Sequence, residues 1–446
     1  MKMLLVSFLL SSVNSMAQTF PKGFQWCVAT AGHQVEGDNI HSDWWHWEQQ
    51  PGKIAGGQRS GKASHHIERL EEDIALIKSI GATTYRFSIE WSRIEPKAGE
   101  FNEQGVAHYR RKLKLLKEAG IEPLVTIHHF VQPQWFTAAG GFVQKDSPQI
   151  FMRYVQKLQK EFGSEIRYWI TFNEPTVVLN SGFGLAEWPP GERYWKHWDP
   201  MIGILKSHAL AYHYLHAQAR AAGRQIQVGM AHHIRPAVPG NWLMRKLLPQ
   251  VDYLFNWAIP VALKTGEVKG FTTKGFWFFR IPWRMQMQME DLKNTQDFIG
   301  INYYTREYVD LSFKPPFLTR TPMPGLRGSD LNWGIDPEGF FEVLKQAHEV
   351  FPDQPFFITE NGLADAKDQW REEFVVSHLK QLHRVINELG HKVEGYCHWS
   401  LIDNFEWHHG FGPRFGLFEV DYANGGQRKA RPSLQRTQQI FKSNSL

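Results

Sequence analysis

Eight short apolar runs, rich in β-branched and aromatic residues, recur along the chain. They span residues 24–30, 83–89, 122–128, 168–173, 225–232, 298–304, 356–360 and 393–400. Between most of them, apolar residues return at spacings of three and four, the period of an amphipathic helix. Strand-like and helix-like segments in steady alternation are typical of parallel strands joined by crossover helices. Eight such units predict a closed (β/α)8 barrel rather than an open sheet.

Three of the helix-like segments also carry start or stop signals. The segment over residues 67–80 stops at Gly81, and the segment over residues 201–222 stops at Gly223. A third begins after Asn102, a residue suited to cap a helix, and stops at Gly120. Glycine commonly follows a helix because it tolerates the left-handed conformation found there. We therefore expect helices that end at these glycines, and a long loop over the barrel rim in the Pro- and Gly-rich residues 314–328.

Polar and aromatic residues stand at or just beyond the ends of the strand-like runs. In a (β/α)8 barrel, the residues at the carboxyl ends of the strands surround the active site. The residues in this position are Gln34, His129, Asn173, Glu174, Asn302, Tyr304, Glu360 and Trp399. The sequence therefore predicts one domain, residues 18–446, with a site at the C-terminal rim of its barrel.

The first seventeen residues differ from the rest and have the layout of a secretory signal peptide. Lys2 precedes the apolar residues 3–10, and small and polar residues follow up to Ala17. The apolar run is too short to span a bilayer. This pattern predicts an exported protein, periplasmic or extracellular. The alternative is an N-terminal extension without a targeting role, in which case the protein would be cytoplasmic.

Charge and composition limit the classes of partner. The net charge of +5 comes from 50 basic and 45 acidic residues that are spread along the 446-residue chain. Because no run of Lys or Arg is long, we expect neither nucleic acid nor an anionic membrane surface as a partner. The chain has 18 Trp and 31 Phe, and aromatic rings can act as platforms for sugars, although most of them fill cores.

Cysteine and histidine give no sign of a metal site. Cys27 and Cys397 lie in the first and last strand-like runs and lack metal-ligand spacing. Closure of the sheet would make them neighbours, but we expect two buried free thiols rather than a bridge. The histidine pairs at 65–66, 232–233 and 408–409 match no standard ligand set and are expected to be ordinary loop and strand residues. We expect neither a metal nor a cofactor.

Two segments place a carboxylate where a strand-like run stops. They are residues 171–175, Thr-Phe-Asn-Glu-Pro, and residues 358–362, Ile-Thr-Glu-Asn-Gly. A pair of Glu residues held face to face can cleave a glycosidic bond, with one as acid and base and the other as nucleophile. Either Glu alone would be read as a solvated loop residue or a helix-cap partner. Together with the residues around them, Glu174 and Glu360 predict a glycosidase.

These segments belong to an ordered set of motifs that resembles glycoside hydrolase family 1, which includes many β-glucosidases and β-galactosidases. The likeness runs from residue 20 to about residue 441. Its motifs are Gln34-Val35-Glu36-Gly37, Tyr85-Arg86-Phe87-Ser88, His128-His129-Phe130, Asn173-Glu174-Pro175, Asn302-Tyr303-Tyr304, Thr359-Glu360-Asn361-Gly362 and residues 399–407, Trp-Ser-Leu-Ile-Asp-Asn-Phe-Glu-Trp.

The resemblance implies a retaining mechanism with Glu174 as the acid/base and Glu360 as the nucleophile. In retaining glycosidases the two carboxyl groups lie about 5–5.5 Å apart. Arg86 and the Tyr304 hydroxyl would keep Glu360 ionised, unless Arg86 only neutralises a buried acid. The negative charge on Glu360 would in turn keep Glu174 protonated until it is needed.

The resemblance also implies the residues that bind the sugar. Asn173 matches the residue that binds the 2-hydroxyl, Trp399 the ring under the sugar, and Trp333 an aromatic residue on the leaving-group side. The other residues assigned to substrate binding are Gln34, His129, Asn302, Glu406 and Trp407. For Gln34, His129 and Trp333 a purely structural role remains an alternative.

The chain departs from the family pattern at two places. Residues 130–131 are Phe-Val where many members have Trp and Asp, which would reshape the wall of the sugar site. Residues 44–47 are Trp-Trp-His-Trp, which would add stacking surface at the entrance.

The expected activity is that of a retaining exo-β-glycosidase acting on a small β-glycoside or oligosaccharide. Terminal glucose is favoured, with galactosides and fucosides as alternatives, and the carboxylate of Glu406 argues against a 6-phosphosugar. A catalytically silent sugar-binding barrel and a transglycosylase that uses the same two Glu residues are the competing readings. A barrel enzyme that depends on phosphate or metal would need a loop or ligand cluster that the chain does not contain. The oligomeric state is left open.

Overall fold

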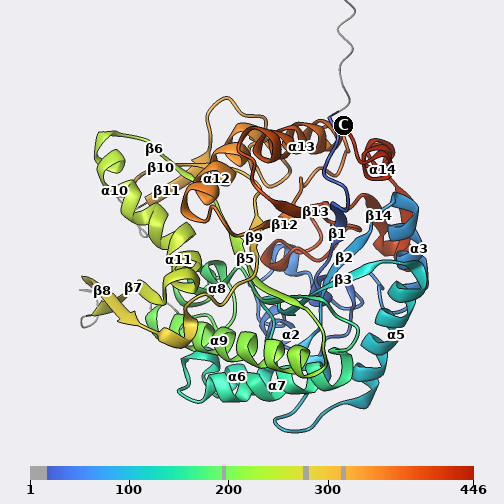
Figure 1. The fold of residues 1–446 in the computed structure, drawn as a ribbon, viewed down its shortest axis with the longest axis horizontal. Coiled ribbons are helices and arrows are strands. Elements are labelled where there is room, and N and C mark those ends of the chain that lie inside the picture. The colour runs from blue at the N-terminus through green and yellow to red at the C-terminus, as the bar shows by residue number, and fades with distance from the viewer. Residues whose placement is uncertain (1–17, 193–196, 275–280, 313–317) are drawn as a thin grey trace, which may run out of the picture.

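Eight parallel strands close into a barrel at the centre of the molecule, surrounded by helices (Figure 1). The computed structural model describes residues 18–192, 197–274, 281–312 and 318–446. Around the ring, the strands follow the order β1, β13, β12, β9, β5, β4, β3 and β2. Their bounds are β1 (Gln25–Ala29), β2 (Thr84–Ser88), β3 (Glu122–His128), β4 (Tyr168–Asn173), β5 (Gln227–His233), β9 (Ile299–Asn302), β12 (Phe356–Asn361) and β13 (Val393–Trp399). The predicted (β/α)8 barrel is confirmed.

Helices cover the outside of the barrel, and several end where the sequence predicted. Gly81 and Gly120 follow α3 and α5 with φ values of 87° and 73°, in the left-handed region that glycine tolerates. The Asn102 side chain accepts a hydrogen bond from the Gln104 amide and so caps α5. The longer helices are α3 (Leu70–Ile80), α5 (Glu103–Ala119), α7 (Ser147–Phe162), α8 (Pro175–Phe183), α9 (Trp198–Ala221), α10 (Trp242–Asp252), α11 (Ala258–Thr265), α12 (Pro337–Val350), α13 (Arg371–Glu388) and α14 (Leu434–Ser443). Shorter ones are α1 (Gly32–Val35), α2 (Asp43–Glu48), α4 (Trp91–Ile94) and α6 (Gln134–Ala138).

The core has two layers because successive side chains of a strand point to opposite faces. One layer packs between strands and helices, as where Trp26 stacks on Phe441 of α14. The other fills the barrel itself, so that the barrel is packed rather than open. Its buried members on the strands include Cys27, Ala29, Leu124, Tyr168, Ile170, Ala231, Phe357, Cys397 and Trp399.

Cys27 and Cys397 form a disulfide, and the expectation of two free thiols is wrong. The two residues lie directly opposite each other in the register of β1 and β13. They are 370 residues apart in the sequence. Barrel closure pairs the first strand with the last, and this register cannot be read from the spacing of two cysteines.

The expectation of a loop over residues 314–328 is also wrong in part. Residues 314–317 lie outside the described part of the chain, but Leu318–Pro322 form strand β11. This strand pairs antiparallel with β10 (Glu307–Leu311), which pairs in turn with β6 (Ala237–Pro239). Thr319 and Thr321 are β-branched and alternate along the chain, which suits an edge strand. The Pro and Gly residues around them led to the prediction of a loop instead. Two hairpins lie outside the barrel as well, β7 (Glu267–Lys274) with β8 (Ile281–Gln288) and β14 (Phe418–Asp421) with β15 (Gln427–Ala430).

The described chain begins where the predicted signal peptide ends. Residues 1–17 lie outside the described part, so the structure does not bear on that prediction. Thr19 bridges to Ser445, and the Phe20 amide donates to the Asn444 carbonyl at 3.0 Å, so this start of the chain lies beside the C-terminus. In the described ranges, no helix combines the length and the apolar character that crossing a membrane requires.

Candidate active site

Glu174 stands immediately after β4, at the N-cap position of α8, and its side chain makes no capping hydrogen bond to this helix. Its φ of 44° and ψ of 58° lie in the left-handed region, which costs a non-glycine residue about 1–2 kcal/mol. This turn directs the Glu174 side chain into a cavity at the C-terminal rim of the barrel. Strand β4 therefore delivers one of the two predicted carboxylates to the rim.

Glu360 lies near the end of β12, lines the same cavity and is held by two donors. Arg86 of β2 donates from Nη1 to Oε1 at 2.5 Å, and the Tyr304 hydroxyl donates to Oε2 at 2.6 Å. Arg86 is itself fully buried. Charge-assisted hydrogen bonds of this kind are the strong ones, so both oxygens of Glu360 are fixed in position.

An amide network connects the two carboxylates behind the cavity. Asn302 donates from Nδ2 to Glu174 Oε1 at 2.6 Å and to Asn173 Oδ1 at 3.1 Å. Its Oδ1 accepts from the Thr359 hydroxyl at 2.6 Å. Arg86 Nη2 donates to the same Asn173 Oδ1 at 2.6 Å. Residues from β2, β4, β9 and β12 are thereby held as one unit.

The cavity that the two carboxylates share has a volume of about 150 Å³. Of the predicted site residues, its walls contain His129, Glu174, Tyr304, Trp333, Glu360, Trp399, Glu406 and Trp407. The other four, Gln34, Arg86, Asn173 and Asn302, lie behind these walls and contact them through the hydrogen bonds described here. All twelve are thus brought together at one rim.

Glu406 lines the same cavity as Glu174 and Glu360, and Gln34 holds it in place. Gln34 Nε2 donates to Glu406 Oε2 at 3.1 Å, to Asn404 Oδ1 at 2.9 Å and to the Phe405 carbonyl at 3.0 Å. Burial, reinforced by the negative charge of Glu360, raises the pKa of Glu406 to about 8, while the hydrogen bond from Gln34 opposes this rise. Because burial favours the neutral form of Glu406, the repulsion of a 6-phosphate that the sequence led us to expect from this carboxylate is weakened near neutral pH.

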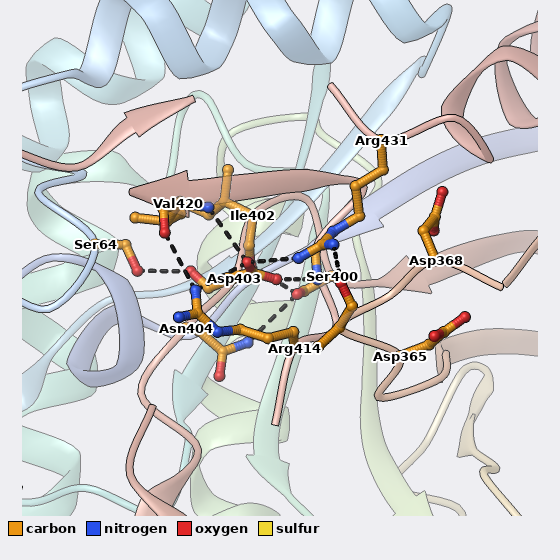
Figure 2. Close-up of polar contacts among 12 residues, drawn as sticks. Ser64, Asp365, Asp368, Ser400, Ile402, Asp403, Asn404, Arg414, Val420 and Arg431 are labelled. Atoms are coloured by element: carbon orange, nitrogen blue, oxygen red, sulfur yellow. Dashed lines mark hydrogen bonds and ion pairs between the residues drawn. The ribbon is translucent and has the colours of Figure 1, made fainter. Parts of the chain in front are cut away.

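A buried ion-pair cluster anchors the loop that carries Glu406 (Figure 2). Asp403 Oδ2 accepts from Arg431 Nη2 at 2.9 Å and from Arg414 Nη1 at 3.2 Å. The backbone amides of Gly416 and Val420 donate to the same carboxylate at 2.9 and 3.2 Å. Because the Asp403 side chain is fully buried, this cluster fixes the chain just before Asn404 and Glu406.

Aromatic rings fill the space beside Glu406, and here the expectation for residues 44–47 needs correction. Trp44 and Trp47 are buried behind the wall rather than exposed at an entrance. Trp44 packs at 4.8 Å from Trp407 and 5.3 Å from Trp188, measured between ring centroids. Phe130 packs against the same two rings at 5.1 and 4.9 Å. The departure at Phe130 is therefore accommodated by an apolar cluster that includes Trp188, which itself lines the cavity.

The two carboxylates differ in pKa, and the order is not the expected one. Burial raises the pKa of Glu174, but His233, Asn302 and Arg86 outweigh burial and bring it below its ordinary value. Burial raises the pKa of Glu360 to about 7; Arg86 and Tyr304 oppose this rise and the negative charge of Glu174 adds to it. The expectation that Glu360 keeps Glu174 protonated took no account of His233, which lies on β5, the strand next to β4.

Sequence analysis missed His233 as a site residue. Its Nδ1 lies 3.3 Å from Glu174 Oε1, and its ring lines the cavity. The predicted strand ended one residue earlier, at His232, and the pair 232–233 was expected to consist of ordinary residues once a metal site had been rejected. Strand alternation could have found it, because Ala231 faces the barrel interior and His233 is two residues further along. Other lining residues without a predicted role are Val177, Trp188, Arg235, His408, His409 and Phe415, and Phe130 lines the cavity as the expected change in its wall requires.

Carboxylates, the imidazoles of His129, His233, His408 and His409, and aromatic rings line the cavity. Over the described ranges, no set of three or more His, Cys, Asp or Glu residues is placed to hold a metal ion. Two carboxylates beside a small cavity, with an arginine on one of them, are suited to acid–base and nucleophilic chemistry at an acetal carbon.

Comparison with known proteins agrees with this chemistry. The family model described as "Glycosyl hydrolase family 1" matches residues 16–446. The chain is 32% identical over 460 residues to a 1,4-beta-D-glucan glucohydrolase of Thermotoga neapolitana, covering 96% of this chain and 99% of that protein. It is 31% identical over 448 residues to Beta-glucosidase A of Thermotoga maritima, covering 96% and 98%.

Solved structures give the same result. A beta-glycosidase from Pyrococcus horikoshii superposes with a TM-score of 0.85 at 36% identity, covering 97% of this chain and 96% of that one. A family 1 β-glucosidase from Thermotoga maritima superposes with a TM-score of 0.87 at 28% identity, covering 97% and 100%.

Proposed function

Because the chain belongs to glycosyl hydrolase family 1, we propose that it removes terminal β-linked sugars, β-D-glucose foremost, by a double displacement with retention. The observation that carries this proposal is the arrangement around Glu360. The buried Glu360 carboxylate accepts hydrogen bonds from Arg86 at 2.5 Å and from Tyr304 at 2.6 Å. It shares one small cavity with a second carboxyl group, that of Glu174.

In the first displacement, a Glu360 oxygen attacks the anomeric carbon and forms an ester bond to the sugar. The bond from that carbon to the leaving oxygen breaks, and the leaving oxygen takes the proton of Glu174. In the second displacement, Glu174 accepts a proton from water while the water oxygen attacks the same carbon. The ester to Glu360 breaks, and the sugar leaves with its original configuration.

The first displacement requires that Glu174 is protonated and that Glu360 is ionised. Arg86 contacts Glu360, and a guanidinium is charged at every relevant pH. The permanent charge of Arg86 supports an ionised Glu360, and the proposal places the shared proton on Glu174.

The size and walls of the cavity support a single terminal sugar as the unit removed. Its volume of about 150 Å³ is below the roughly 300–1,000 Å³ of sites for larger ligands. Trp399 and Trp407 offer aromatic faces, and Glu406 with Gln34 offers hydrogen-bonding atoms to sugar hydroxyls. The names of the relatives, β-glucosidases and a glucan glucohydrolase, support glucose as the first choice.

A panel of nitrophenyl glycosides tests the proposal. It contains the β-glucoside, β-galactoside, β-fucoside, β-mannoside, 6-phospho-β-glucoside and α-glucoside, with Glu360→Ala as the blank and Glu118→Ala, an exposed position on α5, as the matched control. We expect turnover of unphosphorylated β-sugars, its loss in Glu360→Ala only, and release of the β-anomer by proton NMR. Release of the α-anomer, or equal activity in Glu360→Ala, would rule the mechanism out.

The competing readings are separated by the same experiment. A silent sugar-binding barrel would bind the panel without releasing nitrophenol. A transglycosylase would release nitrophenol and transfer the sugar to an added alcohol in preference to water. No observation in the structure favours either of them over hydrolysis.

We also propose that the protein is exported, after removal of residues 1–17. The signal-like sequence supports this, and so does the Cys27–Cys397 disulfide, because disulfides persist mainly in oxidising compartments. N-terminal sequencing of the functional protein tests the proposal. A chain that starts at Gln18 is expected, and an intact Met1 would exclude export by this route.

A further inference from the structure

His233 reaches the predicted acid/base through the geometry of β5. Its neighbour two residues back, Ala231, belongs to the barrel interior, so the His233 side chain lies on the same face at the mouth of the barrel. In register, His233 is opposite Asn302 of β9. The two residues therefore approach Glu174 together, from adjacent strands.

Both of these neighbours contact the same oxygen of Glu174. Asn302 Nδ2 donates to Oε1 at 2.6 Å, and His233 Nδ1 lies 3.3 Å from Oε1. The His233 ring is nearly parallel to the Tyr304 ring, at 28°, and its side chain is only 16% exposed. In the tautomer that carries its hydrogen on Nδ1, His233 makes Oε1 the acceptor of two N–H groups, which leaves the proton of the acid form to Oε2.

We propose that His233 is a positioning residue for the acid–base step: its Nδ1–H, donated to Glu174 Oε1, fixes the carboxyl so that Oε2 gives the proton to the leaving oxygen and later takes one from water. The imidazole donates the same hydrogen bond throughout and exchanges no proton with the substrate. The inference rests on the proposed function, in which Glu174 is the acid/base.

The consequence differs between good and poor leaving groups. A dinitrophenolate leaves without protonation, whereas a phenolate or an alkoxide needs the proton of Glu174. A carboxyl that is free to turn presents its proton in the wrong direction for part of the time. Loss of the His233 hydrogen bond should therefore slow poor leaving groups selectively.

Three substitutions at this position and one control form the test. His233→Ala removes the donor, His233→Asn keeps an N–H near the position of Nδ1, and His233→Gln carries the same amide on a longer chain. His213→Asn, at an exposed position on α9, is the matched control. Each variant is assayed for kcat/KM with phenyl and with 2,4-dinitrophenyl β-glucoside, after circular dichroism has shown that it is folded.

We expect His233→Ala to lower kcat/KM for the phenyl glycoside about 10- to 100-fold and for the dinitrophenyl glycoside less than about three-fold. His233→Asn should recover most of the loss, and His233→Gln should not. In a Glu174→Ala background, His233→Ala should have no further effect, because the residue through which it acts is gone. If His233→Ala does not fold, the inference is tested by comparing the kcat/KM values of His233→Asn and His233→Gln on the phenyl glycoside.

The inference would be overturned if His233→Ala lowered kcat/KM equally for both substrates, or left it unchanged for both. A further loss of kcat/KM when His233→Ala is added to Glu174→Ala would overturn it as well. These results leave the proposed function standing. A wild-type protein that is folded but releases no nitrophenol from any β-glycoside would instead refute the proposed function itself.

Discussion

Removal of the Asp403 carboxylate should destabilise the whole barrel and loosen the wall of the sugar cavity. This carboxylate accepts four hydrogen bonds, from Arg414, Arg431 and the amides of Gly416 and Val420 (Figure 2). In Asp403→Ala, two guanidinium groups and two amides lose their common acceptor, and the Arg431 side chain is only 5% exposed.

The magnitude follows from the burial of the cluster. Removing one partner of a buried ion pair costs about 3–5 kcal/mol because the other charge stays buried without compensation. For a chain of 446 residues, an unfolding entropy of about 2.1 cal/mol/K per residue gives roughly 0.9 kcal/mol/K. The melting temperature of Asp403→Ala should therefore fall by about 3–5 °C.

Differential scanning calorimetry measures this fall, with Asp403→Asn and the exposed Asp353→Ala as companions. The Asn variant keeps one acceptor oxygen and should lose less stability than the Ala variant, and Asp353→Ala should be unchanged. Because Asp403 precedes Asn404 and Glu406, we also expect Asp403→Ala to raise KM for the β-glucoside. A melting temperature within about 1 °C of wild type would show that the cluster does not anchor this loop.

Three further predictions concern other parts of the molecule. Tyr304→Phe removes the hydroxyl that donates to Glu360 at 2.6 Å; since such a bond is worth about 1.5–3 kcal/mol, kcat/KM on aryl glycosides should fall about 10- to 100-fold, and a loss under three-fold would contradict this role. Burial raises the pKa of Glu90 from its ordinary value of 4.5 to about 7, so the wild type loses stability as the pH rises through this window. Urea titrations should therefore show that the free energy of unfolding of Glu90→Gln, relative to that of wild type, is smallest below pH 4.5 and grows up to about pH 8. A difference that does not change with pH would refute the raised pKa of Glu90. Iodoacetamide should label Cys27 and Cys397 only after reduction of the denatured protein, and two labels without reduction, seen by mass spectrometry, would exclude the disulfide.

The strand pattern predicted the barrel closely because each strand carries its own local signal. All eight barrel strands lie within two residues of the apolar runs in the sequence, and α3 and α5 end at Gly81 and Gly120 as predicted. These features depend on residues close together in the chain. The twelve predicted site residues also meet at one rim, because strand ends converge in any (β/α)8 barrel.

Features that depend on distant partners were missed or misjudged. Strand β11 needed β10 as a partner, and its own composition read as a loop. Trp44 read as part of an entrance but is buried against Trp188 and Trp407, which are far away in the sequence. His233 read as an ordinary strand residue until the fold placed it on Glu174.

The sequence by itself determined the fold class, the family and the two carboxylates, since periodicity and ordered motifs are properties of the chain alone. Only the tertiary structure decided that the two cysteines bond, how the pKa values of the two carboxyl groups are shifted and how Glu174 is oriented. The disulfide depends on the register between the first and last strands. The pKa values of Glu174 and Glu360 depend on burial, on charged groups of β2 and β5 and on a hydrogen bond from Asn302 of β9, which come together only after the barrel closes. Electrostatic and hydrogen-bond energies act over a few ångströms of space, and the linear order of residues does not specify those distances.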